Sequence, residues 1–205
     1  MLWGWVARLL GPLLLVHLFR RLSYAHARAP PHDYALNALA ATLLARPGDV
    51  LLCKGGSADS CTVAAWSLSD WTHVALVGPD RAVYDMTPGE NERRMSLWAY
   101  VRAYEGWVCW ARRPPPAAWH DPGARVFRED PAALVLATLA AGRWGELVRR
   151  LLAGRFRRMA REPRAICSEY VAAALGLPTP AHTHPADFAP GGRYGAEGPV
   201  VLLTT

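Results

Sequence analysis

The sequence lacks the patterns that several functional classes require. Lys54 is the only lysine among 23 basic residues, and there is no zinc-finger spacing, RNA-binding signature or basic tail. The net charge of +6 therefore does not indicate a nucleic-acid-binding protein. Four cysteines are too few and too scattered for a disulfide scaffold in a chain of 205 residues. We expect free thiols, with a bridge between Cys53 and Cys61 as the alternative.

The overall composition bounds the size and class of the protein. With 52% hydrophobic and 20% charged residues, the chain is typical of globular proteins and is slightly apolar for a purely soluble one. A chain of 205 residues can bury one core and is too short for two domains of ordinary size. We expect a single domain over residues 29–205, preceded by a separate segment over residues 1–28.

That first segment begins with the apolar stretch MLWGWVARLLGPLLLVHLF, which is close to the length of a membrane-spanning helix. Residues 1–28 are expected to form a membrane anchor or a signal-like segment. No charged region precedes the stretch, and Arg20 and Arg21 separate it from the small-residue pattern at 25–27, which disfavours a secretory signal. Tryptophans at one end and arginines at the other predict membrane association through residues 1–22, with the domain on the cytoplasmic side. A cleaved signal, an interfacial helix and a docked core helix are the alternatives.

Turn and cap residues divide the rest of the chain into short elements. Apolar periodicity and these boundary residues predict strands at 48–53, 71–78, 81–86 and 106–113, and helices at 34–45, within 56–70, and at 131–141, 144–159 and 167–175. The helix over 144–159 carries apolar residues on one face and arginines on the other. This pattern favours a surface helix packed on the domain, with a basic helix on anionic lipid as the alternative.

A histidine interrupts the apolar run WTHVALVG, which otherwise has the composition of a buried strand. His73 is either a core histidine whose ring nitrogens are satisfied or a side chain that the fold presents for chemistry. The next apolar run, RAVYDM, follows Gly78, Pro79 and Asp80, which are typical hairpin residues. A three-residue loop of these residues places Asp85 directly opposite His73, and a two-residue turn places it one position away.

Cys167 stands at or near the start of a predicted helix in the stretch PRAICSEYVAAALG. The positive end of a helix dipole and the unpaired backbone N–H groups there favour a thiolate over a thiol. A thiolate nucleophile needs a base that also returns a proton to the leaving group, and histidine suits both tasks. The hypothesis is that Cys167 is the nucleophile, His73 the base and Asp85 the group that orients the imidazole. Glu90 and Glu92, which fall in a predicted turn, are the alternative orienting acids.

Several of these stretches together resemble a known family. PGDVLLC, a serine-rich helix, DWTHVALV, AVYDM, and later ICSEYV and HPADF are similar to the permuted papain-like (permuted NlpC-type) superfamily. That group contains the YiiX/YaeF-like amidases and the lecithin:retinol acyltransferase-like proteins. The resemblance covers about residues 46–190, and its most specific pieces are HVALV and CSEYV. In this chain, as in that superfamily, the histidine strand precedes the cysteine helix.

The resemblance implies an α+β fold, with a small antiparallel sheet or partial barrel packed against helices, to which this chain adds an N-terminal apolar helix. Cys167 falls on the family's nucleophile, His73 on its base and Asp85 on a polar position of the next strand. It implies a cysteine-dependent amidase that forms a thiol acyl-enzyme on peptide-like or N-acyl lipid amide bonds. A lipid acyltransferase of the same fold and a non-catalytic membrane-associated structural protein are the alternatives. No cofactor and no metal are expected.

The remaining polar and sulfur-containing groups have structural interpretations. Glu169 is expected to be a carboxylate that stabilises the helix start, with contact to the site as the alternative. His182 and His184 form an H-x-H pair with no third ligand at a recognised spacing, which indicates loop histidines rather than a metal site. Cysteines outside position 167 are expected to be packed core thiols: Cys53, Cys61 and Cys109.

Overall fold

The computed structural model describes residues 34–56, 60, 63–64, 69–116, 118–120, 125–128, 147, 150–155, 164–178, 183–195 and 200–203. The predictions for the N-terminal segment 1–28, including its apolar helix, and for Cys61 and His182 lie outside these ranges. The same holds for the predicted helix at 131–141 and for most of those within 56–70 and at 144–159. Within the ranges described, no helix is both long and apolar enough to cross a membrane.

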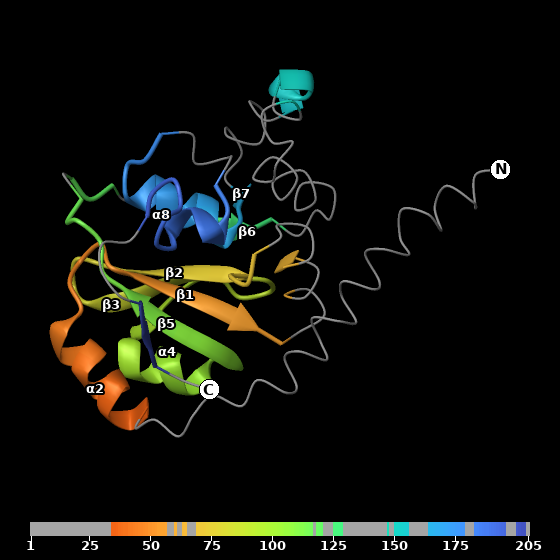
Figure 1. The fold of residues 1–205 in the computed structure, drawn as a ribbon. Helices are drawn as coiled ribbons and strands as arrows, with labels where there is room; N and C mark the ends of the chain where they lie inside the picture. The colour runs from red at the N-terminus through yellow and green to blue at the C-terminus, as the bar shows by residue number, and fades with distance from the viewer. Residues whose placement is uncertain are drawn as a thin grey trace.

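A six-stranded antiparallel sheet organises the described residues (Figure 1). Its order is β4-β3-β2-β1-β5-β8, so the first four strands along the chain are neighbours in reverse order. The strands are β1 (Val50–Gly55), β2 (His73–Val77), β3 (Ala82–Thr87), β4 (Asn91–Ser96), β5 (Gly106–Ala111) and β8 (Val200–Leu202). A separate parallel pair consists of β6 (Val126–Phe127) and β7 (Arg164–Ala165).

Helices lie on both sides of this sheet (Figure 1). On one side are α2 (Tyr34–Leu44) and α4 (Leu97–Ala103), which pack against each other. On the other side are α8 (Cys167–Ala174) and the 3₁₀ helix η2 (Pro185–Phe188). The predicted α+β class, with an antiparallel sheet packed against helices, is confirmed.

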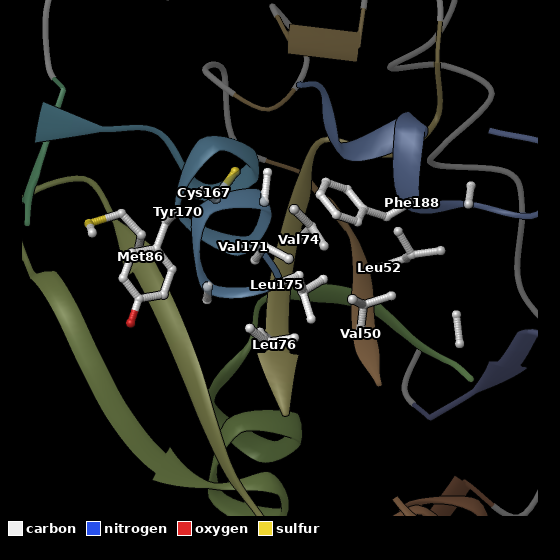
Figure 2. Packing of buried hydrophobic residues seen from close by; sticks show 14 of the residues in the cluster. Val50, Leu52, Val74, Leu76, Met86, Cys167, Tyr170, Val171, Leu175 and Phe188 are labelled. Atoms are coloured by element: carbon white, nitrogen blue, oxygen red, sulfur yellow. The ribbon is translucent and has the colours of Figure 1, made fainter. Parts of the chain in front are cut away.

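Alternation along the strands creates two hydrophobic cores, one on each side of the sheet. Val50, Leu52, Val74 and Leu76 face α8 and η2, where they pack with residues such as Tyr170 (Figure 2). The residues between them face the other way and pack with α2 and α4; they include Leu51, Cys53, Ala75 and Val77. Because both faces of β1 and β2 are covered, these strands are apolar in sequence except for Lys54 and His73.

The strands predicted from apolar runs are all present, with ends shifted by no more than two residues. Six elements were not predicted: β4, α4, β6, β7, η2 and β8. The sequence of β4, NERRMS, is polar because β4 is an edge strand whose side chains are exposed or only partly buried. Polar residues of this kind are also typical of turns. The predicted turn at Glu92 is therefore wrong, because Glu92 lies in β4, whereas Glu90 does lie in a turn.

Candidate active site

The hairpin between β2 and β3 sets the position of Asp85 relative to His73. Leu76 pairs with Tyr84, and the Gly78 N–H donates to the Ala82 carbonyl at 2.8 Å, so the loop is Pro79–Arg81. The predicted loop of residues 78–80 is therefore wrong by one position. Pro79 fits the first central position of a type I turn, which the Arg81 N–H closes by donating to the Gly78 carbonyl, and Arg81 is left-handed with φ of 62°.

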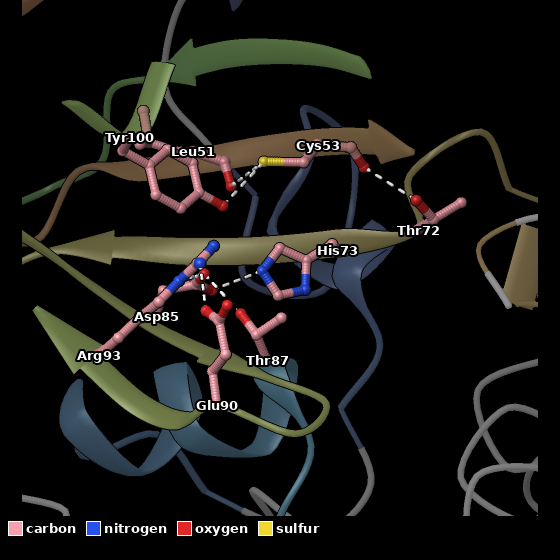
Figure 3. Close-up of polar contacts among 9 residues, drawn as sticks. All are labelled: Leu51, Cys53, Thr72, His73, Asp85, Thr87, Glu90, Arg93 and Tyr100. Atoms are coloured by element: carbon pink, nitrogen blue, oxygen red, sulfur yellow. Dashed lines mark hydrogen bonds and ion pairs between the residues drawn. The ribbon is translucent and has the colours of Figure 1, made fainter. Parts of the chain in front are cut away.

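This register moves Asp85 but keeps it on the face that His73 occupies. Continuing the pairing of Leu76 with Tyr84 places Asp85 opposite Ala75, two residues from the position opposite His73. Two residues correspond to one full period of a strand, so both side chains point to the same side and meet diagonally. The Nε2 atom of His73 and the Oδ1 atom of Asp85 are 2.5 Å apart (Figure 3).

Asp85 is fully buried and holds three side-chain contacts at once. One oxygen contacts His73, and the other accepts hydrogen bonds from Thr87 Oγ1 at 2.8 Å and from Arg93 Nε at 2.9 Å (Figure 3). Arg93 lies directly opposite Asp85 in the β3–β4 ladder and also forms an ion pair with Glu90. A carboxylate with both oxygens engaged cannot rotate away from the imidazole without breaking these contacts.

Electrostatics favour the charged forms of both groups. Burial alone raises the pKa of Asp85, but the charge and hydrogen bond of His73, the Thr87 hydroxyl and the charge of Arg93 outweigh it and lower that pKa to about 2. Burial alone lowers the pKa of His73, but the charges of Asp85 and Cys167 and hydrogen bonds to both raise it well above its ordinary value. The site therefore stabilises an imidazolium beside a carboxylate.

Cys167 is the first residue of α8, and its side chain lies near enough to His73 to help raise the pKa of the imidazole. It lies against the start of β2, near Val74 (Figure 2). Because Asp85 occupies Nε2 of His73, Nδ1 is the ring nitrogen that remains for the thiol. The structure thus brings His73 into contact with Asp85 and places Cys167 near enough to affect the pKa of the same imidazole.

The start of α8 is held by buried polar groups. Glu169 Oε2 accepts a hydrogen bond from the Ile166 N–H at 3.1 Å, which confirms the expectation that this carboxylate serves the helix start. Arg128 Nη2 lies 3.5 Å from the same oxygen, and both side chains are buried. On the other side, Ser168 Oγ donates to the Thr183 carbonyl at 2.8 Å. The backbone that carries Cys167 is thereby fixed from two directions.

The alternative orienting acids contact other residues. Glu90 pairs with Arg93, and Glu92 Oε1 accepts a hydrogen bond from the Tyr170 hydroxyl at 2.9 Å. Asp85 is the carboxylate that contacts His73 in the described part of the chain.

Three neighbours of the site were not predicted from the sequence: Thr87, Arg93 and Tyr104. The Tyr104 ring stacks on the His73 ring with centroids 6.1 Å apart. Arg93 was missed because β4 was not recognised as a strand; with β4 in place, its register opposite Asp85 gives the contact. Nothing in the local sequence signals Tyr104, which follows the unpredicted helix α4.

Cys53, Cys109 and His184 are buried parts of the fold. Cys53 and Cys109 are buried free thiols, as expected, and burial raises the pKa of each, with that of Cys109 reaching about 12. Cys53 is therefore not bridged to Cys61. His184 accepts a hydrogen bond from the Ala186 N–H, and burial lowers its pKa to about 4. No group of three or more metal-ligating side chains gathers among the residues that the structure describes.

The sequence matches no protein-family model and no curated protein. An interpretation of this site consequently depends on its own geometry. The arrangement contains a cysteine at a helix start, a histidine whose pKa that cysteine helps to raise, and a buried carboxylate in contact with the histidine.

Proposed function

We propose that the protein is a cysteine-dependent amidase that forms a thiol acyl-enzyme on peptide-like or N-acyl lipid amide bonds. The observation that carries the proposal is a single imidazole that contacts a buried carboxylate and whose pKa is raised by both that carboxylate and a helix-start cysteine. A histidine that serves only to fill a core has no need of both partners. Here Asp85 and Cys167 each favour the protonated ring, and this is the state that stores a proton for transfer to a leaving group.

The proposed reaction proceeds in two halves. The Cys167 sulfur attacks the amide carbonyl, and backbone N–H groups at the start of α8 stabilise the negative oxygen of the tetrahedral intermediate. His73 gives its proton to the leaving nitrogen as the carbon–nitrogen bond breaks, which releases the amine and leaves a thioester. Neutral His73 then takes a proton from water as the water oxygen attacks the thioester. The carbon–sulfur bond breaks, which releases the carboxylic acid and restores the Cys167 thiolate.

The chain order supports a permuted papain-like arrangement as the finer description of the fold. The histidine strand β2 precedes the cysteine helix α8 in the chain, and β2 belongs to an antiparallel sheet. We propose that residues 29–205 form this one catalytic domain. Residues 1–22 would associate it with a membrane, with Arg20 and Arg21 placing it on the cytoplasmic side.

Mass-spectrometric mapping of thiol alkylation tests the proposal without knowledge of the substrate. The full chain is treated with iodoacetamide at about pH 6, where an activated thiolate reacts and a buried neutral thiol does not. We expect modification at Cys167 ahead of Cys53, because burial raises the pKa of the Cys53 thiol. The His73→Ala variant should slow modification at Cys167 and leave Cys53 unchanged. Equal rates at Cys167 in the two proteins would refute the assignment of His73 as its base.

A further inference from the structure

The helix α2 has an inverted distribution of large and small apolar residues. Its buried face consists of small side chains, Ala38 and Ala41, and it is followed by buried Ala45. Its outer face carries leucines that are between 49% and 64% exposed: Leu36, Leu39, Leu43 and Leu44. A surface helix of a soluble protein normally buries its leucines and exposes polar residues. An exposed stripe of this kind marks an interaction surface.

Contacts to neighbouring elements fix this orientation of α2. Asn37 Nδ2 donates to the Leu202 carbonyl of β8 at 3.0 Å, and the buried alanines pack in the core that contains Tyr100 of α4. Close approach of α2 to these elements requires small residues on the inner face. Turning the helix to bury its leucines would break the Asn37 contact and would force larger side chains into a filled core.

The residues around the exposed leucines have the composition expected of a surface that binds an anionic bilayer. The helix itself, YALNALAATLL, contains no charged residue. At its C-terminal end, Arg46 is exposed and Arg112 Nη2 donates to the Leu44 carbonyl at 3.1 Å. Trp98, on the helix α4 that packs against α2, is 40% exposed. Leucines and a tryptophan next to arginines fit a lipid interface, where apolar groups enter the acyl region and cations meet phosphate headgroups.

We propose that α2 is a membrane-docking face that lies in the interface of an anionic bilayer, with its leucine stripe towards the lipid. Its place in the chain supports this occupant, because α2 follows directly on the N-terminal region that contains the apolar stretch and Arg20 and Arg21. The proposal concerns described residues of the folded domain and does not depend on the chemistry at Cys167. Docking through α2 would leave α8, on the other side of the sheet, facing away from the lipid (Figure 1).

Photo-crosslinking of the full chain tests what covers the stripe. The protein is produced with photo-leucine, a diazirine analogue of leucine, reconstituted with vesicles of phosphatidylcholine and phosphatidylserine, and irradiated. Peptides that contain α2 are then analysed by mass. We expect adducts of phospholipid on these peptides. Adducts that join α2 to residues 1–33, adducts that join it to a second copy of the chain, or reaction with water alone would each overturn the proposal.

Matched variants separate docking from incidental contact. The Leu39→Asn/Leu43→Asn variant should lose phospholipid adducts at the remaining leucines, Leu36 and Leu44, because the face no longer enters the lipid. Leu151→Asn alters a leucine that is 73% exposed elsewhere and should leave the adducts on α2 unchanged. Circular dichroism checks that both variants stay folded. Undiminished lipid adducts in the double variant would overturn the proposal.

Discussion

His73 and Asp85 are joined by a 2.5 Å contact between Nε2 and Oδ1 although they do not stand opposite each other in the β2–β3 hairpin. The contact is diagonal, and it holds because the second oxygen of Asp85 is fixed by Thr87 and Arg93. The imidazole is therefore oriented by a carboxylate that is itself immobilised from the neighbouring strand β4. The properties of this pair lead to the first two predictions.

Replacing Asp85 with asparagine should lower the pKa of His73, because the variant loses the carboxylate charge that opposes the effect of burial. The asparagine keeps the size of the side chain, so we expect catalysis to fall by less than it does when His73 is removed. NMR titration of the His73 ring measures the shift. Glu90→Gln is the matched control, since Glu90 contacts Arg93 and should leave the titration of His73 little changed. An unaltered His73 titration in Asp85→Asn would contradict the assignment.

Stability should decline in acid through Asp85. Its pKa is about 2 in the folded chain and 3.8 for an unperturbed aspartate, so the ionised group stabilises the fold fully above about pH 4. This contribution, about 2 kcal/mol, is lost as the pH falls towards 2. His73 has a raised pKa and acts in the opposite sense, because its contribution is lost as the pH rises through the folded value. The free energy of unfolding, measured with urea at several pH values, should fall less steeply in acid for Asp85→Asn than for the original chain. The same fall in both proteins would contradict this prediction.

Cys167 and His73 should act as one catalytic unit. Cys167→Ala should abolish amide hydrolysis, and His73→Ala should lower kcat/KM by about 10²- to 10⁴-fold without unfolding the chain. The double variant should be no worse than Cys167→Ala, because the base has no role once its nucleophile is gone. Steady-state kinetics on an amide substrate, with circular dichroism as the folding control, measures this. Small losses that add in the double variant would rule out the unit.

Removing one partner of the buried ion pair of Arg128 and Glu169 should cost more stability than removing the exposed Asp70 from its pair with the partly buried Lys54. Glu169→Gln removes the negative charge that balances Arg128 in the interior, and we expect a loss of about 3 to 5 kcal/mol. Asp70→Asn breaks a pair at the surface and should lose less than about 1 kcal/mol. Urea unfolding of the two variants decides the matter, and equal losses would show that burial of the pair has no special weight.

Deleting residues 1–28 should change how the protein is extracted from membranes. If this segment is the anchor, the full chain requires detergent, whereas the shortened chain associates only peripherally. The reactivity of Cys167 towards iodoacetamide should be the same in both, because the site lies in the folded domain. Fractionation followed by alkylation measures both properties. A shortened chain that still requires detergent would place the anchor elsewhere.

Much of the sheet could be predicted because strands covered on both faces have a clear apolar signal. β1 and β2 are apolar except for Lys54 and His73, and the prediction of β3 needed only the hairpin residues before it. β4 could not be recognised, because an edge strand with exposed side chains has the composition of a loop. For the same reason, the contact between Arg93 and Asp85 could not be predicted.

The site was predictable where local chemistry determined it. Cys167 at a helix start and His73 in a strand are visible in the sequence, and Asp85 was found although the predicted loop was wrong by one residue. A shift of the pairing by two positions preserves the face of a strand, so this error did not change which side chains meet. Arg128 could not be predicted, because its buried partner Glu169 belongs to a distant segment and neither sequence context signals the pair.

The parallel pair of β6 and β7 has a consequence for engineering the chain. It holds the ends of residues 129–163 side by side, with Arg128 Nη2 donating to the Arg164 carbonyl at 2.6 Å, just before the cysteine helix. The entropy of closing a loop grows only with the logarithm of its length, so the number of residues between these two strands has a weak effect on the cost of pairing them. An engineered change in that length therefore acts only weakly through loop closure on the strand pair that leads into the cysteine helix.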